Sequence, residues 1–70
     1  MNDHRKAMGA HLRRVREAQE VSRVSLASDL GVTLSAVTQW ETGETAPKLD
    51  HQIALRNILR DPTLYSGVAA

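Results

Sequence analysis

Side chains that form hydrogen bonds, rather than catalytic groups, mark the most unusual stretch of the sequence, residues 31–43 (GVTLSAVTQWETG). The hydroxyls of Ser35 and Thr38 and the amide of Gln39 both donate and accept hydrogen bonds. The only tryptophan of the chain, Trp40, lies among them. We expect one face of this segment to contact a polar partner, while the tryptophan anchors the other face in a core.

Groups suited to catalysis or metal binding are missing or dispersed. The sequence has no cysteine, so it offers neither a thiolate nucleophile nor a disulfide. His4, His11 and His51 have no carboxylate at the spacing of a metal site. Neither a glycine-rich phosphate loop nor a nucleophile elbow occurs. We therefore expect no enzyme activity, no metal and no cofactor.

Length and composition indicate one small domain spanning residues 1–70, with a loose N-terminal end and a loose tail over 66–70. The sequence contains 3% aromatic residues and no phenylalanine, so its core must be aliphatic. The net charge is only +1, although basic residues are concentrated in the first third. No apolar run approaches the roughly 20 residues of a membrane helix. A cytoplasmic protein without a membrane segment is expected.

Hydrophobic periodicity predicts helices and no strands. The expected helices cover residues 4–20, 23–30, 34–41 and 51–60, with one final turn within 63–68. Ser22, Thr33 and Asp50 are the predicted N-caps of the last three helices, because their side-chain oxygens accept from free backbone amides. Gly31 and Gly43 are placed to end the second and third. The expected apolar face of the fourth helix consists of Ile53 or Ala54, Leu55, Ile58 and Leu59.

The second and third predicted helices match a helix-turn-helix unit counted from Arg23 as its first position. That unit needs apolar residues at its fourth, eighth, tenth, fifteenth and eighteenth positions, a small residue at the fifth and glycine at the ninth. All seven requirements are met, in order, by Leu26, Ala27, Leu30, Gly31, Val32, Val37 and Trp40. A plain αα-corner needs only two short helices and a glycine. The spacing therefore predicts a helix-turn-helix over about residues 22–41.

On these residues the sequence resembles the phage repressor and Cro-like helix-turn-helix regulators. The resemblance covers about residues 11–59 and is carried by HLRRVRE, SLASDLGVTLSAVTQWETG and Pro47. It implies a compact, all-α, lambda-repressor-like bundle of four or five helices in a cytoplasmic bacterial or phage protein. It also implies binding to double-stranded operator DNA, usually as a homodimer, and an ion pair between Arg16 and Glu41.

The predicted DNA contacts follow from the motif. When Val37 and Trp40 point inward, helical geometry turns a second set of side chains outward, toward base edges in the major groove. This set is Leu34, Ser35, Thr38 and Gln39. The expected contacts to the DNA backbone are Ser22, Arg23, Thr33, Thr42 and Lys48.

Three functions fit the sequence. The first is a repressor that binds a palindromic operator as a homodimer, with residues 33–41 in the major groove. The second is an antitoxin that binds both DNA and a toxin. The third is an interaction module that keeps the fold without binding DNA. Two departures from the family pattern bear on this choice: Arg23 replaces a frequent glutamine, and Lys48 is the only basic residue between Glu44 and Asp50.

Overall fold

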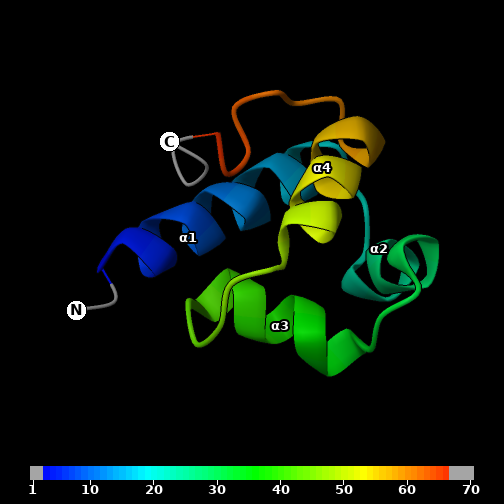
Figure 1. The fold of residues 1–70 in the computed structure, drawn as a ribbon. Helices are drawn as coiled ribbons and strands as arrows, with labels where there is room; N and C mark the ends of the chain where they lie inside the picture. Colours follow the sequence, from blue (N-terminus) through cyan, green and yellow to red (C-terminus); the bar gives the residue numbers. More distant parts are fainter. Residues whose placement is uncertain (1–2, 67–70) are drawn as a thin grey trace.

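The structure, a computed structural model, describes residues 3–66 and contains four helices and no strand within that range (Figure 1). The helices are α1 (Asp3–Ala18), α2 (Arg23–Leu30), α3 (Leu34–Thr42) and α4 (Leu49–Ile58). Helix α1 packs on α3, and α2 packs on both α3 and α4. The predicted all-α bundle is confirmed. Among residues 3–66, every helix is too short or too polar to cross a bilayer.

Caps define both helices of the predicted motif. The Ser22 hydroxyl accepts from Ser25 N at 3.0 Å, and the Thr33 hydroxyl accepts from Ala36 N at 3.1 Å. Gly31 ends α2 in the left-handed region, with φ of 70°. Its amide donates to Ser28 O and that of Val32 to Ala27 O, so the chain reverses within one turn. The predicted caps of α2 and α3 are confirmed.

The start of α4 differs from the prediction. Lys48 is the N-cap and provides no side-chain capping bond, whereas Asp50 lies in the first turn and accepts from His51 N. The Asp50 cap was therefore wrong. The Gln52 amide donates to the carbonyl of buried Pro47 at 2.9 Å, so a side chain within the helix provides the hydrogen bond for a carbonyl of the preceding loop. This bond accompanies an earlier helix start, and Asp50 still lies at the favourable N-terminal end of the dipole.

The ends of α1 and α4 also differ from the sequence prediction. Helix α1 begins at Asp3, one residue before the predicted start at position 4, and ends at Ala18, two residues before position 20. Helix α4 ends at Ile58, and turns without regular helix follow through Ser66. The predicted final turn is therefore present up to Ser66. The loose tail was predicted for 66–70; Ser66 is in a turn, and 67–70 lie outside the described residues.

The core lies between α1, α2, α3 and α4 and is mainly aliphatic. Its buried members are Leu12, Leu26, Ala27, Val37, Trp40, Leu55, Leu59, Leu64 and Tyr65. Trp40 is buried, as predicted, and its ring lies 5.6 Å from that of His51. On α4, Leu55 and Leu59 are buried and Ala54 and Ile58 are half-buried, as expected, whereas Ile53 is exposed and Gln52 is buried. The bond from Gln52 Nε2 to Pro47 O offsets part of the cost of burying this polar side chain, whose Oε1 accepts no hydrogen bond within residues 3–66.

The segment after α4 closes the core. Leu64 and Tyr65 are buried, and burial raises the pKa of the Tyr65 hydroxyl well above its usual range. Arg56 Nη1 donates to Leu64 O at 3.0 Å, and the His11 ring lies 2.9 Å from the Thr63 hydroxyl. These contacts hold the turns after α4 against the bundle.

Close contact between α1 and α3 depends on Gly9. This glycine is buried in the middle of α1. A side-chain carbon there would collide with Trp40 O and would lie 2.8 Å from Glu41 O. The last turn of α3 therefore rests directly on the backbone of α1. This contact sets how α3 lies on the rest of the molecule.

Candidate nucleic-acid interface

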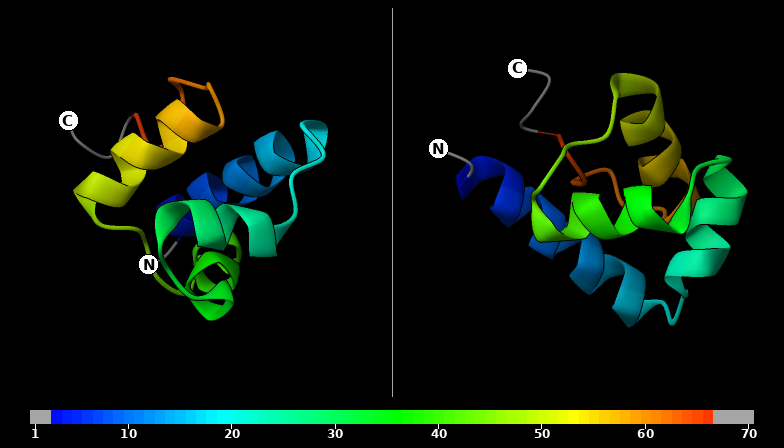
Figure 2. Two further views of the ribbon diagram at one scale, coloured as in Figure 1. Left: turned by 90° about the vertical axis from the view of Figure 1, so that its right-hand side faces the viewer. Right: turned by 90° about the horizontal axis from the view of Figure 1, so that it is seen from below.

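Helix α3 presents one face to the core and another to solvent. Val37 and Trp40 are buried, whereas Leu34 and Ser35 are exposed and Thr38 and Gln39 are half-buried. Seen from the side of α3, the helix lies across the front of the bundle (Figure 2, right). The geometry thus places all four predicted base-contact residues on the solvent side. Contact with bases stays a prediction.

The polar groups of this face keep hydrogen-bonding capacity. Thr38 Oγ1 donates to Leu34 O, and Thr42 Oγ1 donates to Gln39 O, each at 3.1 Å. Each hydroxyl oxygen can still accept from a ligand. The Gln39 side chain forms no hydrogen bond within residues 3–66, so both its acceptor and its donors are available.

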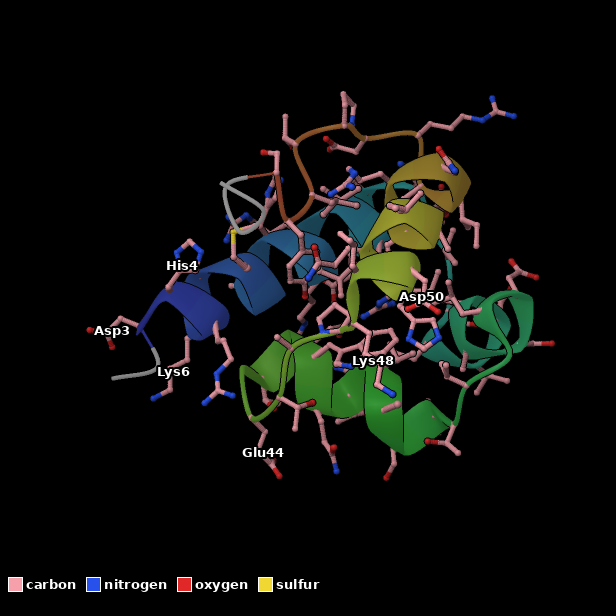
Figure 3. The ribbon with its side chains drawn as sticks, viewed as in Figure 1. Asp3, His4, Lys6, Glu44, Lys48 and Asp50 are labelled. Atoms are coloured by element: carbon pink, nitrogen blue, oxygen red, sulfur yellow. The ribbon has the colours of Figure 1, made fainter. Side chains whose placement is uncertain are left out.

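The predicted backbone-contact residues lie at helix ends. Ser22 and Arg23 begin α2, Thr33 precedes α3 and Thr42 is the last residue of α3. Lys48 lies at the start of α4 together with Asp50, while Glu44 points away from the bundle below α3 (Figure 3). All except Arg23 are exposed. The structure therefore arranges them around α3, and phosphate binding by them stays a prediction.

A buried ion pair joins α1 to the end of α3, as the resemblance implied. Arg16 Nε lies 2.5 Å from Glu41 Oε2, and Arg16 Nη2 donates to Glu41 Oε1 at 3.2 Å. Arg16 Nη1 donates to Val21 O at 2.7 Å. The hydrogen bonds to Glu41 raise the pKa of the Arg16 guanidinium against the opposing effect of burial. This pair fixes the last turn of α3 to α1.

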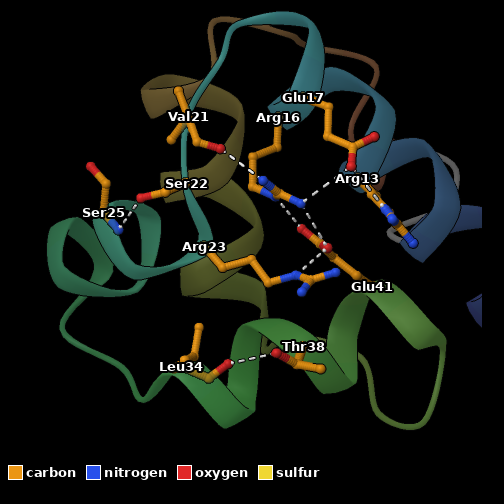
Figure 4. Close-up of polar contacts among 10 residues, drawn as sticks. All are labelled: Arg13, Arg16, Glu17, Val21, Ser22, Arg23, Ser25, Leu34, Thr38 and Glu41. Atoms are coloured by element: carbon orange, nitrogen blue, oxygen red, sulfur yellow. Dashed lines mark hydrogen bonds and ion pairs between the residues drawn. The ribbon is translucent and has the colours of Figure 1, made fainter.

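A second arginine reaches the same carboxylate from another helix. Arg23 Nε donates to Glu41 Oε1 at 2.9 Å, so Arg16 and Arg23 approach Glu41 from two sides (Figure 4). Sequence reasoning assigned Arg23 to the DNA backbone and missed this contact. The departure from glutamine at position 23 was the available signal, but nothing local showed where the side chain would point.

Gly9 is the other structural determinant that sequence reasoning missed. It contacts no ligand itself, but it allows α3 to lie close to α1. A glycine inside a helix costs roughly 1 kcal/mol relative to alanine, so its presence in α1 was a usable signal for close packing.

Two short helices joined by a glycine turn, with the apolar positions of the unit packed in or against the core and a polar outer face on the second helix, are typical of the helix-turn-helix class of DNA-binding proteins. Comparison with protein families supports this assignment: the model of the helix-turn-helix domain matches residues 7–60. The chain therefore belongs to the helix-turn-helix domain family. Comparisons with curated proteins and with solved structures gave no match.

Proposed function

We propose that this protein is a sequence-specific transcriptional repressor that binds a palindromic operator as a homodimer. The observation that carries the proposal is the orientation of α3. Val37 and Trp40 are buried, while Leu34, Ser35, Thr38 and Gln39 lie on its solvent side. The match to the helix-turn-helix domain family supports the proposal, because this motif docks its second helix on DNA. Repression then follows from occupying a promoter that the polymerase needs.

Base recognition is assigned to the outer face of α3. The major groove is about 12 Å wide and accepts one helix. Gln39 can pair with adenine through two hydrogen bonds, and Ser35 can bond to several bases. The exposed side chain of Leu34 is suited to contact a thymine methyl group. We therefore expect A·T pairs within each half-site.

The sparse positive charge of the loop after α3 supports binding as a dimer. Lys48 is the only basic residue in the loop after α3, and Glu44 in the same loop repels phosphate. Phosphate contacts provide much of the affinity for DNA. One subunit offers few of them, so we expect it to bind weakly. Two subunits on half-sites about 34 Å apart would double that number.

Selection of bound duplexes from a random DNA pool, at a stated salt concentration, tests the proposal. We expect an enriched palindrome that contains A·T pairs in both halves. Enrichment of a single half-site would contradict the dimer but keep specific binding. No enrichment would contradict specific DNA binding and favour an interaction module.

An antitoxin that also binds a toxin is the second candidate, favoured by exposed apolar side chains on α4. Leu49 and Ile53 are 58% and 46% exposed and lie one helical turn apart. Light scattering on a variant with Leu49→Ser and Ile53→Ser separates the two uses of this patch. Loss of the dimer would show that the patch mediates self-association. An intact dimer would favour a contact between the patch and another protein.

Replacing Gln39 by alanine should weaken specific binding without affecting folding. We expect discrimination against a changed base pair to fall by about 1–3 kcal/mol, the usual value of a bidentate base contact. The free energy of unfolding should change by less than about 0.5 kcal/mol, because the amide bonds to nothing within the described residues. Titration of the selected duplex and of a mismatched one measures the first quantity, and thermal denaturation the second.

The control for Gln39→Ala is Asn57→Ala, which removes another exposed amide from α4. It should leave both discrimination and stability unchanged. Equal losses of binding in the two variants would contradict a base contact at Gln39.

A further inference from the structure

The guanidinium of Arg16 is fully committed inside the protein. Its Nε and Nη2 donate to Glu41, and its Nη1 donates to Val21 O. The Arg16 side chain is only 8% exposed and that of Glu41 only 1%. Arg16 therefore neutralises Glu41 and presents nothing to a ligand.

Arg23 brings a surplus positive charge to this cluster. Glu17 also lies near this cluster, 3.9 Å from Arg16 Nη2, but it is paired with Arg13 at 3.1 Å. The full set therefore has three guanidinium groups (Arg13, Arg16 and Arg23) and two carboxylates (Glu17 and Glu41), with a net charge of about +1. The Arg23 side chain is 36% exposed, and only its Nε bonds to Glu41. Its Nη groups form no hydrogen bond within residues 3–66. The surplus charge therefore reaches solvent through the outer edge of Arg23.

The position of that edge links two parts of the interface. Arg23 is the first residue of α2, whereas Glu41 lies in the last turn of α3. Glu41 follows Gln39 by two residues on the same short helix. Any force transmitted through Arg23 to Glu41 thus acts on the helix that carries the proposed base contacts.

On the basis of the proposed DNA binding, we propose that Arg23 is a positioning residue with two simultaneous partners. Its Nη groups bind a DNA phosphate while its Nε holds Glu41. The planar guanidinium then connects the DNA backbone to the end of α3 and fixes the position of Gln39 along the groove. Arg23 in this way contributes to sequence discrimination without contacting a base.

This arrangement requires the fork of an arginine. A guanidinium binds two anions through different nitrogens, which keeps those anions apart. The ammonium of lysine has one nitrogen, so Glu41 and the phosphate would have to approach the same atom. Both anions would then lie close together and repel each other, so we expect a lysine at position 23 to weaken one of the two contacts.

Arg23→Lys, Arg23→Met and the control Arg60→Met test the proposal. Arg60 is exposed and follows α4, whose C-terminal end lies remote from α3 (Figure 1). Three quantities are measured for each: the melting temperature without DNA, the slope of log K against log salt, and the affinity ratio between the selected duplex and a scrambled one. The ratio is the quantity that a purely structural role would leave unchanged at equal folding.

For Arg23→Met we expect a lower melting temperature and a salt slope reduced by about 0.9 per subunit, the value of one phosphate contact. The affinity ratio should fall about tenfold, as for one misplaced hydrogen bond to a charged group. Arg23→Lys should show either the lower melting temperature or the reduced salt slope. In both cases the affinity ratio should also be reduced. Arg60→Met should resemble the wild type in all three.

Specific outcomes overturn the proposal. An unchanged salt slope in Arg23→Met would show that Arg23 does not contact a phosphate. An unchanged melting temperature would show that its bond to Glu41 does not stabilise the fold. An unchanged affinity ratio would show that Arg23 does not position Gln39. Arg23→Lys with wild-type values throughout would show that a point charge suffices. If the wild type bound no DNA, both the proposed function and the phosphate contact of Arg23 would be contradicted. Binding by the wild type with an unaltered Arg23→Met slope would overturn this inference alone.

Discussion

Replacing Arg16 by alanine should lower the free energy of unfolding by about 3–5 kcal/mol, the usual cost of removing one partner from a buried ion pair. Glu41, whose side chain is 1% exposed in the intact protein, would keep only the Nε of Arg23 as a charged donor, and Val21 O would lose its donor as well. A domain of this size has a total stability of only about 4–10 kcal/mol. The expected fall in melting temperature is therefore on the order of 15 °C or more.

Arg13→Ala is the matched control for Arg16→Ala. Arg13 is on the same helix and pairs with Glu17 at 3.1 Å, but both side chains are more than half exposed. Such a surface pair contributes about 0–1 kcal/mol. Circular dichroism during urea and thermal unfolding compares the two. Similar losses would contradict a structural role for the buried pair, and Arg16→Lys, which keeps the charge, gives a milder test if the alanine variant does not fold.

Replacing Gly9 by alanine should also destabilise the fold, although alanine has a higher helix propensity than glycine. In an exposed helix this change would stabilise by roughly 1 kcal/mol. Here the added carbon would collide with Trp40 O and lie 2.8 Å from Glu41 O, and both atoms belong to the backbone of α3. Overpacking of this kind costs about 1–3 kcal/mol and sometimes more. We expect a net loss of about 2 kcal/mol and a displaced α3.

Ala7→Gly measures the helix preference alone, because Ala7 is exposed on the same helix. It should cost up to about 1 kcal/mol. Chemical denaturation of both variants separates the effect of close packing on the free energy of unfolding from the effect of helix propensity. A Gly9→Ala protein more stable than the wild type would show that α1 and α3 can separate freely, contrary to the packing described above. For Gly9→Ala we further expect weaker discrimination on the selected duplex, since Glu41 shares α3 with Gln39.

The elements around the proposed interface were largely predictable because their signals are local. Ser22 and Thr33 are separated by three residues from the amides that they cap, and Gly31 supplies the positive φ of the turn itself. The outward face of α3 followed from helical geometry once Val37 and Trp40 were placed inward. Asp50 shows the limit of such signals: a good capping residue was present, but the helix started earlier.

The sequence by itself therefore determined four helices, the turn at Gly31 and the polar outer face of α3. Only the tertiary structure decided how these parts lie on one another. Gly9 meets α3 about 30 residues later in the chain, Arg23 meets Glu41, and the polar Gln52 is buried while Ile53 is exposed. Caps and helix periods depend on neighbours within one turn, so the chain encodes them locally. Close packing and the partner of a long charged side chain depend on atoms brought together by folding, so residue type alone does not reveal them.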